Sequence, residues 1–267
     1  MGFRYSSLIL SIFFLQAFVP SFAQEWQLTD SILFNTEITA LSSDPAHNIY
    51  AGGINGAIIR VDGNSSEIQK LQAPTNGSIA MIDANNPLKL FVSSIENQEF
   101  AFIERLISRQ EKSRFSTYSS DYVQCATPFP DNSIWMLSMP SRELKQYNTM
   151  TGISIQRVPI TPFDIDDPIS MLAYRNKLIL SSTNTTLILN QFGQRTAQRT
   201  FDEIKSVQVK NDMIWILTTK KLMGLNMSLV TQIEYGLPSR RYDRFVMLSD
   251  QTVFSYDNRL DFYSIPR

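Results

Sequence analysis

Three nearby carboxylates are the first side chains in this sequence whose types and spacing could support chemistry. Asp164, Asp166 and Asp167 lie in the segment 162–168, between two prolines. Closely spaced carboxylates can supply oxygen ligands to Ca²⁺. The segment lacks the Gly and the terminal Glu of an EF-hand loop, so a solvated acidic turn is the favoured interpretation. We therefore expect no metal and no other cofactor.

A second candidate group combines arginine with tyrosine near the end of the chain. Arg240, Arg241, Tyr242 and Arg244 fall within five consecutive positions. Arg and Tyr are enriched at binding hot spots, and this mixture could contact the carboxylates of a partner or a glycan. The competing interpretation, which we favour, pairs these arginines with neighbouring carboxylates of the same fold. The group is thus a tentative partner-binding site.

The sequence offers little for a catalytic nucleophile paired with a base that activates it. The chain has one cysteine, Cys125, and one histidine, His47. Cys125 lies in the strand-like segment 122–126 and is interpreted as a buried structural thiol, whereas His47 lies in a turn and is interpreted as a surface residue. A single cysteine also means that no disulfide forms within the chain.

Motifs of the common enzyme classes are absent from the sequence. It contains no Gly-x-Ser-x-Gly elbow, no phosphate-binding glycine loop, no His-Glu-x-x-His helix and no sialidase-type Ser-x-Asp-x-Gly-x-Thr-Trp turn. We therefore expect a binding protein and not an enzyme, with no catalytic residues to name. The alternative is a carbohydrate-active enzyme or a glycan-binding protein that uses carboxylates in the central funnel, because paired carboxylates from distant parts of the chain leave no local signature.

A recurring unit of four short strands supplies the elements that must position these residues. Turn signals punctuate the chain, and the first strands of successive units start near residues 38, 78, 122, 169, 204 and 244. The intervals are close to the roughly 40 to 50 residues of a four-stranded propeller blade. The sequence predicts an all-β, six-bladed β-propeller, with five or seven blades as open alternatives.

The last unit contains three strands instead of four. Segment 25–33 precedes the first unit and has no other partner, so we expect it to become the outer strand of the final blade. Such closure removes the exposed edge that an open sheet would leave.

The repeat resembles that of known bacterial propellers. The stretches 38–44, 48–56 and 59–62 in the first unit, with Asn132–Trp135 and Thr151–Gly152 in the third, resemble secreted WD-repeat-like and sensor-type propellers. The resemblance extends in rhythm over the whole repeat region, and in detail over these two units only. It implies a propeller fold and a tendency to bind partners or ligands, without assigning a subfamily or an activity.

The N-terminal segment has the features of a secretory signal peptide. One cation, Arg4, precedes the apolar run 8–19, and Ser21-Phe22-Ala23 matches a cleavage site for signal peptidase. We expect a signal peptide over residues 1–23 and a single propeller domain over residues 24–267. The alternative is an uncleaved membrane anchor, but the run is short for a bilayer span of about 20 residues, so cleavage is favoured. No other stretch approaches that length, so no membrane span is expected in the mature chain.

Composition limits the partners. Lys plus Arg number 24 and Asp plus Glu 25, so the formal net charge of −1 gives no general attraction to nucleic acid. The expected protein is an exported, non-enzymatic propeller in the cell envelope, periplasm or extracellular space. It would bind a protein or glycan partner through the loops that connect its blades.

Overall fold

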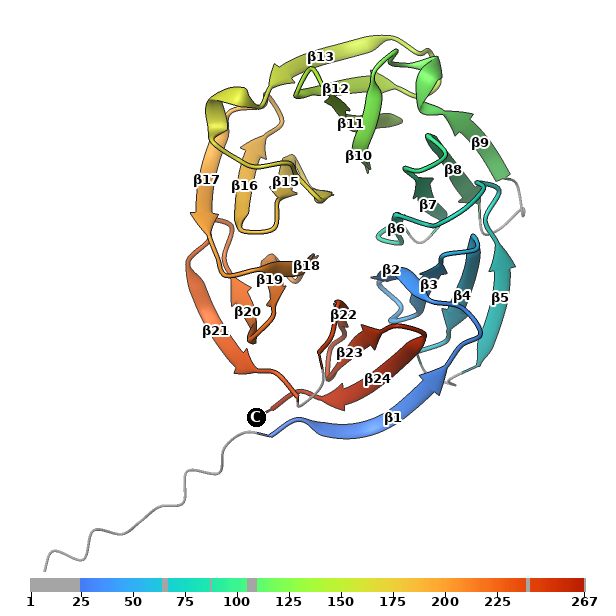
Figure 1. Ribbon diagram of the computed structural model, residues 1–267, viewed down its shortest axis with the longest axis vertical. Coiled ribbons are helices and arrows are strands. Elements are labelled where there is room, and N and C mark those ends of the chain that lie inside the picture. The colour runs from blue at the N-terminus through green and yellow to red at the C-terminus, as the bar shows by residue number, and fades with distance from the viewer. Residues whose placement is uncertain (1–24, 64–66, 87, 105–109, 239–240, 267) are drawn as a thin grey trace, which may run out of the picture.

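The computed structural model describes residues 25–63, 67–86, 88–104, 110–238 and 241–266. Within these residues the strands form six antiparallel sheets of four strands each. The sheets are arranged around a central axis like the blades of a propeller (Figure 1). The predicted six-bladed propeller is therefore confirmed.

In five blades the four strands follow one another in the chain, from an inner strand near the axis to an outer strand at the rim; in the sixth, the outer strand comes from the N-terminal part of the described chain. The first three blades contain β2 (Ile38–Ser43), β3 (Ile49–Gly53), β4 (Ala57–Val61) and β5 (Ile68–Gln72); β6 (Met81–Asp83), β7 (Lys89–Ser94), β8 (Glu99–Glu104) and β9 (Gln110–Arg114); and β10 (Tyr122–Phe129), β11 (Ser133–Met139), β12 (Glu143–Asn148) and β13 (Ser154–Pro159). The other three contain β14 (Ser170–Tyr174), β15 (Lys177–Ser181), β16 (Thr185–Asn190) and β17 (Arg195–Thr200); β18 (Ile204–Lys210), β19 (Met213–Thr218), β20 (Lys221–Leu225) and β21 (Thr231–Gly236); and β22 (Arg244–Met247), β23 (Gln251–Tyr256), β24 (Arg259–Ser264) and β1 (Gln27–Leu33). Short 3₁₀ turns, η1 (Phe115–Thr117) and η2 (Thr161–Phe163), lie in the connections after the second and third blades.

Hydrophobic patterning explains the place of each strand in its blade. The second and third strands are buried along most of their length, as in β3, β16 and β19, because neighbouring blades cover both of their faces. The outer strands β13 and β21 instead alternate between more and less exposed side chains, which is the pattern of a half-covered sheet edge.

The hydrophobic core is divided among the seams between blades. Each of six clusters of buried side chains joins two adjacent blades; one, for example, packs Tyr50 and Ile58 of the first blade against Leu90 and Val92 of the second. Apolar burial of this kind, at roughly 25 cal/mol per Å², is what fixes the blades relative to one another. The inner strands around the axis are therefore held by a rigid surround.

The ring is closed by both ends of the described chain. Strand β1 pairs antiparallel with β24, from Gln27 opposite Ser264 to Leu33 opposite Arg259. Just before β1, the indole Nε1 of Trp26 donates a hydrogen bond to the carbonyl of Gly236 in the preceding blade. The prediction that the N-terminal segment completes the last blade is confirmed.

Two further expectations concern the chain ends and the membrane. The predicted signal peptide, residues 1–23, lies outside the described residues and stays a prediction. In the part of the chain that the structure describes, no helix has the length and apolar character needed to cross a membrane.

Candidate functional site

A pocket of about 340 Å³ opens on the propeller axis. Its walls come from the ends of β2, β6, β14 and β18 and from the turns that follow these inner strands. We call it the axial pocket, and we call the side of the disc on which it opens the hairpin face, because the turns between the first and second strands and between the third and fourth strands lie there. Its size is within the range of small-molecule sites. The blade-connecting loops, which we expected to bind, lie on the opposite face.

Asp83, the last residue of β6, is a half-buried carboxyl in the wall of the axial pocket. Its Oδ1 accepts a hydrogen bond of 2.8 Å from the backbone N–H of Asn85, which holds the side chain in the turn. Loss of solvation raises the pKa of Asp83 above its ordinary value of 3.8, although the hydrogen bonds from Asn85 act in the other direction. Burial thus makes loss of the proton from this carboxyl less favourable than it is in water.

Lys210 ends β18 and brings a cation to the same pocket. Desolvation lowers the pKa of its ammonium, and the nearby charge of Asp44 partly opposes this shift. The Asp44 carboxylate is held by the backbone N–H groups of Ala46 and Asn48, the Asn48 amide and the Tyr50 hydroxyl. Asp44 therefore shapes its turn, and Lys210 is the group with donors to offer to a ligand.

Gln208, two residues before Lys210 on β18, also lines the pocket. Its Nε2 donates to the carbonyl of Leu41 in the first blade, and its Oε1 accepts from the N–H of Met247 in the sixth, both at 3.4 Å. One side chain from the fifth blade thus contacts inner strands of two other blades. This bridge links the inner strands of three blades at the pocket wall.

His47 is half-buried in a turn at the edge of the axial pocket. The residue has a positive φ of 66°, and its Nε2 is 2.9 Å from the Ser249 hydroxyl of the last blade. The interpretation of His47 as a surface residue therefore missed its place beside the pocket. Its turn position was visible in the sequence, but nothing local indicated that six such turns surround one axis.

A smaller chamber of about 90 Å³ lies farther along the axis. Met81 and Leu172 line both this chamber and the axial pocket, so these two side chains form the boundary between them. Apolar groups at this boundary limit how deeply a charged ligand can enter. The charged groups named above all lie on the wider side of it.

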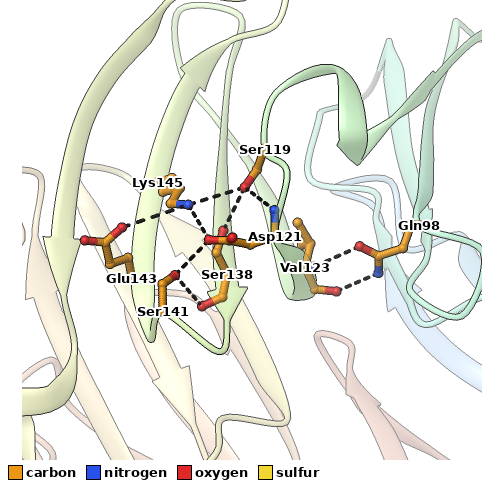
Figure 2. A network of polar contacts seen from close by, with 8 residues as sticks. All are labelled: Gln98, Ser119, Asp121, Val123, Ser138, Ser141, Glu143 and Lys145. Atoms are coloured by element: carbon orange, nitrogen blue, oxygen red, sulfur yellow. Dashed lines mark hydrogen bonds and ion pairs between the residues drawn. The ribbon is translucent and has the colours of Figure 1, made fainter.

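A separate polar network in the third blade shows what charge pairing looks like elsewhere in this fold (Figure 2). The Lys145 side chain is almost fully buried, and its Nζ donates to Asp121 at 2.7 Å and to the Ser119 hydroxyl at 3.3 Å, with Glu143 at 3.9 Å. The hydrogen bonds from Lys145 and Ser141 lower the pKa of Asp121. This network stabilises a blade, because its lysine already has carboxylate partners.

The candidate calcium ligands do not form a cluster. Asp167 pairs with Arg142, and the Asp164 carbonyl accepts a hydrogen bond from Gln198. Across the described residues, no three His, Cys, Asp or Glu side chains, Asp166 included, are grouped in a way that could hold a metal ion.

The structure separates the members of the Arg and Tyr group. Tyr242 is buried, and its hydroxyl bonds to Asp261 and Tyr263, whereas Arg244 donates to the Ile38 carbonyl across a blade seam. Burial raises the pKa of Tyr242 and lowers that of Arg244. Arg241 is exposed, and Arg240 lies outside the described residues. A partner-binding role for this group stays a prediction, and two of its members have structural contacts.

Cys125 is a buried free thiol, as predicted. Its Sγ donates to the Pro168 carbonyl at 3.3 Å, and desolvation raises its pKa to about 12. A thiol with such a pKa is not an active nucleophile at neutral pH.

The fold is similar to that of known propellers. A catalytically inactive histidine-to-alanine variant of virginiamycin B lyase from Staphylococcus aureus, crystallised with quinupristin, covers 90% of this chain and 100% of its own, with a TM-score of 0.65 and 10% identity. Selenomethionine-substituted virginiamycin B lyase from the same organism gives a TM-score of 0.63 at 10% identity, with the same coverage. The computationally designed protein Ika8 gives 0.51 at 9% identity, covering 85% of this chain and 71% of its own. No protein-family model and no curated protein matches the sequence.

These similarities correct the expectation that the protein is not an enzyme. Two of the similar structures are of a lyase, so a propeller of this kind is compatible with catalysis, and the absence of local motifs was a wrong ground for excluding it. At 10% identity the likeness shows the fold alone. The resemblance to WD-repeat-like and sensor-type propellers is borne out as a propeller fold, without a subfamily.

Proposed function

We propose that this protein is an exported propeller that binds a ligand through an anionic group in the axial pocket. The carrying observation is Lys210, whose ammonium is partly removed from water in the pocket wall. A ligand carboxylate or phosphate would accept charged hydrogen bonds from this ammonium in place of the water that it has lost.

The N-terminal features favour export of the protein from the cytoplasm. A protein with a signal peptide and no disulfide would serve in the periplasm, the outer envelope or the extracellular space. A rigid ring with seams of buried apolar side chains suits that setting, because its stability does not depend on cross-links.

The test is a titration of the purified protein with matched small probes. N-acetylglutamate and inorganic phosphate are compared with N-acetylglutamine, using calorimetry on the wild type and on Lys210→Met. We expect the anions to bind more tightly than the amide, and Lys210→Met to lose about tenfold or more in affinity, since a charged hydrogen bond contributes about 1.5–3 kcal/mol.

Lys220→Met is the matched control. Lys220 is an exposed lysine on the opposite face of the disc, where it pairs with Asp202. Equal affinity of the wild type, Lys210→Met and Lys220→Met for the anions would overturn the proposal, as would equal binding of N-acetylglutamate and N-acetylglutamine.

A second candidate function is a lyase reaction in the same pocket, favoured by the place of His47. A base there would remove a proton from carbon while an acid protonates the departing group. His47 and Lys210 are a base and an acid that line one pocket. Quinupristin, the compound bound to the similar lyase, is the first probe: the wild type should consume it and His47→Ala should not. Quinupristin that stays intact with the wild type would count against this candidate.

A further inference from the structure

A second pocket adjoins the axial pocket on the hairpin face. Its volume is about 230 Å³, and it lies between the second and third blades, where β8 and the turn after β10 form part of its wall. Asp83, the last residue of β6, lines both pockets, so the two pockets meet at this side chain. We call the second one the Phe129 pocket.

The Phe129 pocket has an aromatic wall. The rings of Phe91, Phe102 and Phe129 line it, together with Pro128 and Pro130. The Phe91 ring is fully buried, and its centre lies 5.4 Å from that of Phe102 at an interplanar angle of 56°. Phe102 and Phe129 are half-buried, so part of each ring stays accessible. Aromatic rings prefer edge and offset contacts with one another, and this wall offers such contacts to the ring of a ligand.

Lys89 adds a contact that distinguishes one kind of ring from another. This side chain lines the Phe129 pocket, and its Nζ lies 4.3 Å from the centre of the Phe102 ring. An ammonium is attracted to the face of an aromatic ring by the quadrupole of its π-system, which a saturated ring does not have. An aromatic ring in this pocket therefore gains more than a saturated ring of similar size.

The size of the Phe129 pocket limits how much of a ligand it can hold. An apolar cavity of about 150 Å³ accommodates benzene, so about 230 Å³ is enough for one six-membered ring and a short linking group. The chamber of about 90 Å³ farther along the axis is too small for such a ring. Sites that enclose a whole drug-sized molecule measure about 300–1,000 Å³. The rest of a ligand whose ring lies here would extend past Asp83 into the axial pocket.

We propose that the ligand of this protein is a small aromatic acid, whose ring occupies the Phe129 pocket while its anionic group binds in the axial pocket. The aromatic wall, the volume of the pocket and its junction with the axial pocket at Asp83 support the placement of the ring. This inference rests on the proposed function, because the acid group is placed at Lys210.

The experiment is calorimetry with a series of ω-phenylalkanoates, from phenylacetate to phenylhexanoate, which varies the distance between ring and carboxylate. Each acid is compared with the ring-free alkanoate of the same chain length and with its cyclohexyl analogue. We expect at least one phenyl acid to bind about tenfold more tightly than its ring-free counterpart, and about threefold more tightly than its cyclohexyl analogue. Equal affinities of the phenyl and ring-free acids at every chain length would overturn the inference, as would equal affinities of the phenyl and cyclohexyl acids.

Two variants test where the ring lies. Phe102→Leu keeps an apolar side chain but removes a ring from the wall, and it should reduce the advantage of the phenyl acid over the ring-free acid about threefold. Lys89→Met should bring the phenyl and cyclohexyl acids to equal affinity. Both variants should bind the ring-free acids as the wild type does, which shows that the fold is intact. Phe192→Leu is the control, because this exposed ring lies in a different depression of the same face and should change nothing.

Lys210→Met separates the inference from the proposed function. If Lys210→Met weakens all the acids and the ring adds no affinity, the anion site stands and the aromatic ligand is wrong. If the ring adds affinity that neither Phe102→Leu nor Lys89→Met reduces, the ring binds elsewhere and the inference fails. If Lys210→Met changes the affinity of no acid, the proposed function fails, and a ring effect that Phe102→Leu reduces would leave the Phe129 pocket as a binding site on its own.

Discussion

Lys145 and Lys210 are both held away from bulk water, yet their ammonium groups meet different surroundings. Lys145, in the middle of the third blade, donates to Asp121 and Ser119. Lys210, at the edge of the axial pocket, has the charge of Asp44 nearby but donates no hydrogen bond among those found in the described residues. A lysine with bonded partners stabilises the fold, whereas one with donors to spare is suited to bind something else.

The difference follows from where the residues lie in a blade. Lys145 is on β12, a third strand covered by its neighbours on both faces, and β13 and the connection after η1 enclose its surroundings. Lys210 is at the end of β18, an inner strand whose side chains meet the axis. Inner strand ends from different blades converge there, so charges on them can gather without being paired within one sheet.

Loss of ring closure should have the largest effect on stability and on binding, because the surroundings of both lysines depend on the closed ring. Deletion of residues 25–33 removes β1 and Trp26 and exposes the edge of β24. We expect aggregation, or a fall in Tm of at least roughly 10 °C, together with loss of anion binding. Calorimetry and gel filtration give the readouts. An unchanged Tm would show that the ring, and hence the comparison between its two polar sites, does not require β1.

Breaking the paired site should lower stability without altering binding. Asp121→Ala leaves the buried Lys145 ammonium with Glu143, at 3.9 Å, as its remaining carboxylate neighbour among the contacts found. A buried charge without its close partner is costly, so we expect Tm to fall by about 5 °C. The exposed pair of Asp202 and Lys220 provides the control, since Asp202→Ala should leave Tm within about 1 °C. Equal Tm values for the two variants would mean that the buried pair of Lys145 and Asp121 contributes no more to stability than the exposed pair.

Replacing the lysine of the axial pocket should raise stability instead of lowering it. The pKa of Lys210 is lowered by burial, which means that its charged form is less favourable in the folded than in the unfolded protein. Lys210→Met removes this cost and should raise Tm by about 2 °C at neutral pH, while anion binding is lost. A clear fall in Tm would instead make Lys210 a structural residue.

Much of this fold could be predicted from the sequence, because turns and strand patterns are local. The expected first strands near 38, 122, 204 and 244 match β2, β10, β18 and β22, and the expected starts at 169 and 78 are off by one and three residues. The short β6 begins later than expected because its pairing with β7 starts only at Met81.

The axial site could not be predicted in the same way. Asp83, Tyr174 and Lys210 are far apart in the chain, and only ring closure brings them to one pocket. Each is the last residue of an inner strand, so polar residues at that repeated position were the available signal. Aspartates close in sequence drew attention instead, although the fold uses Asp167 to hold Arg142.

Asp83→Asn should have the smallest effect on Tm, but the pH dependence of that effect tests the surroundings of one carboxyl in the axial pocket. The pKa of Asp83 is raised in the folded protein, so its proton is bound more tightly there than in the unfolded chain. The wild type therefore loses stability from this group as pH rises from its ordinary pKa of 3.8 through the higher folded value. Asn carries no titrating proton and does not have this loss.

The measurement is the difference in Tm between Asp83→Asn and the wild type as a function of pH. We expect the difference to grow in favour of the variant as pH rises through that window and then to level off at about 1–2 °C. Other carboxylates cancel in the difference, including Asp121, whose lowered pKa acts with the opposite sign. A difference that stays flat with pH would mean that the Asp83 carboxyl is as well solvated as in the unfolded chain. The axial pocket would then differ from the third-blade network only at Lys210.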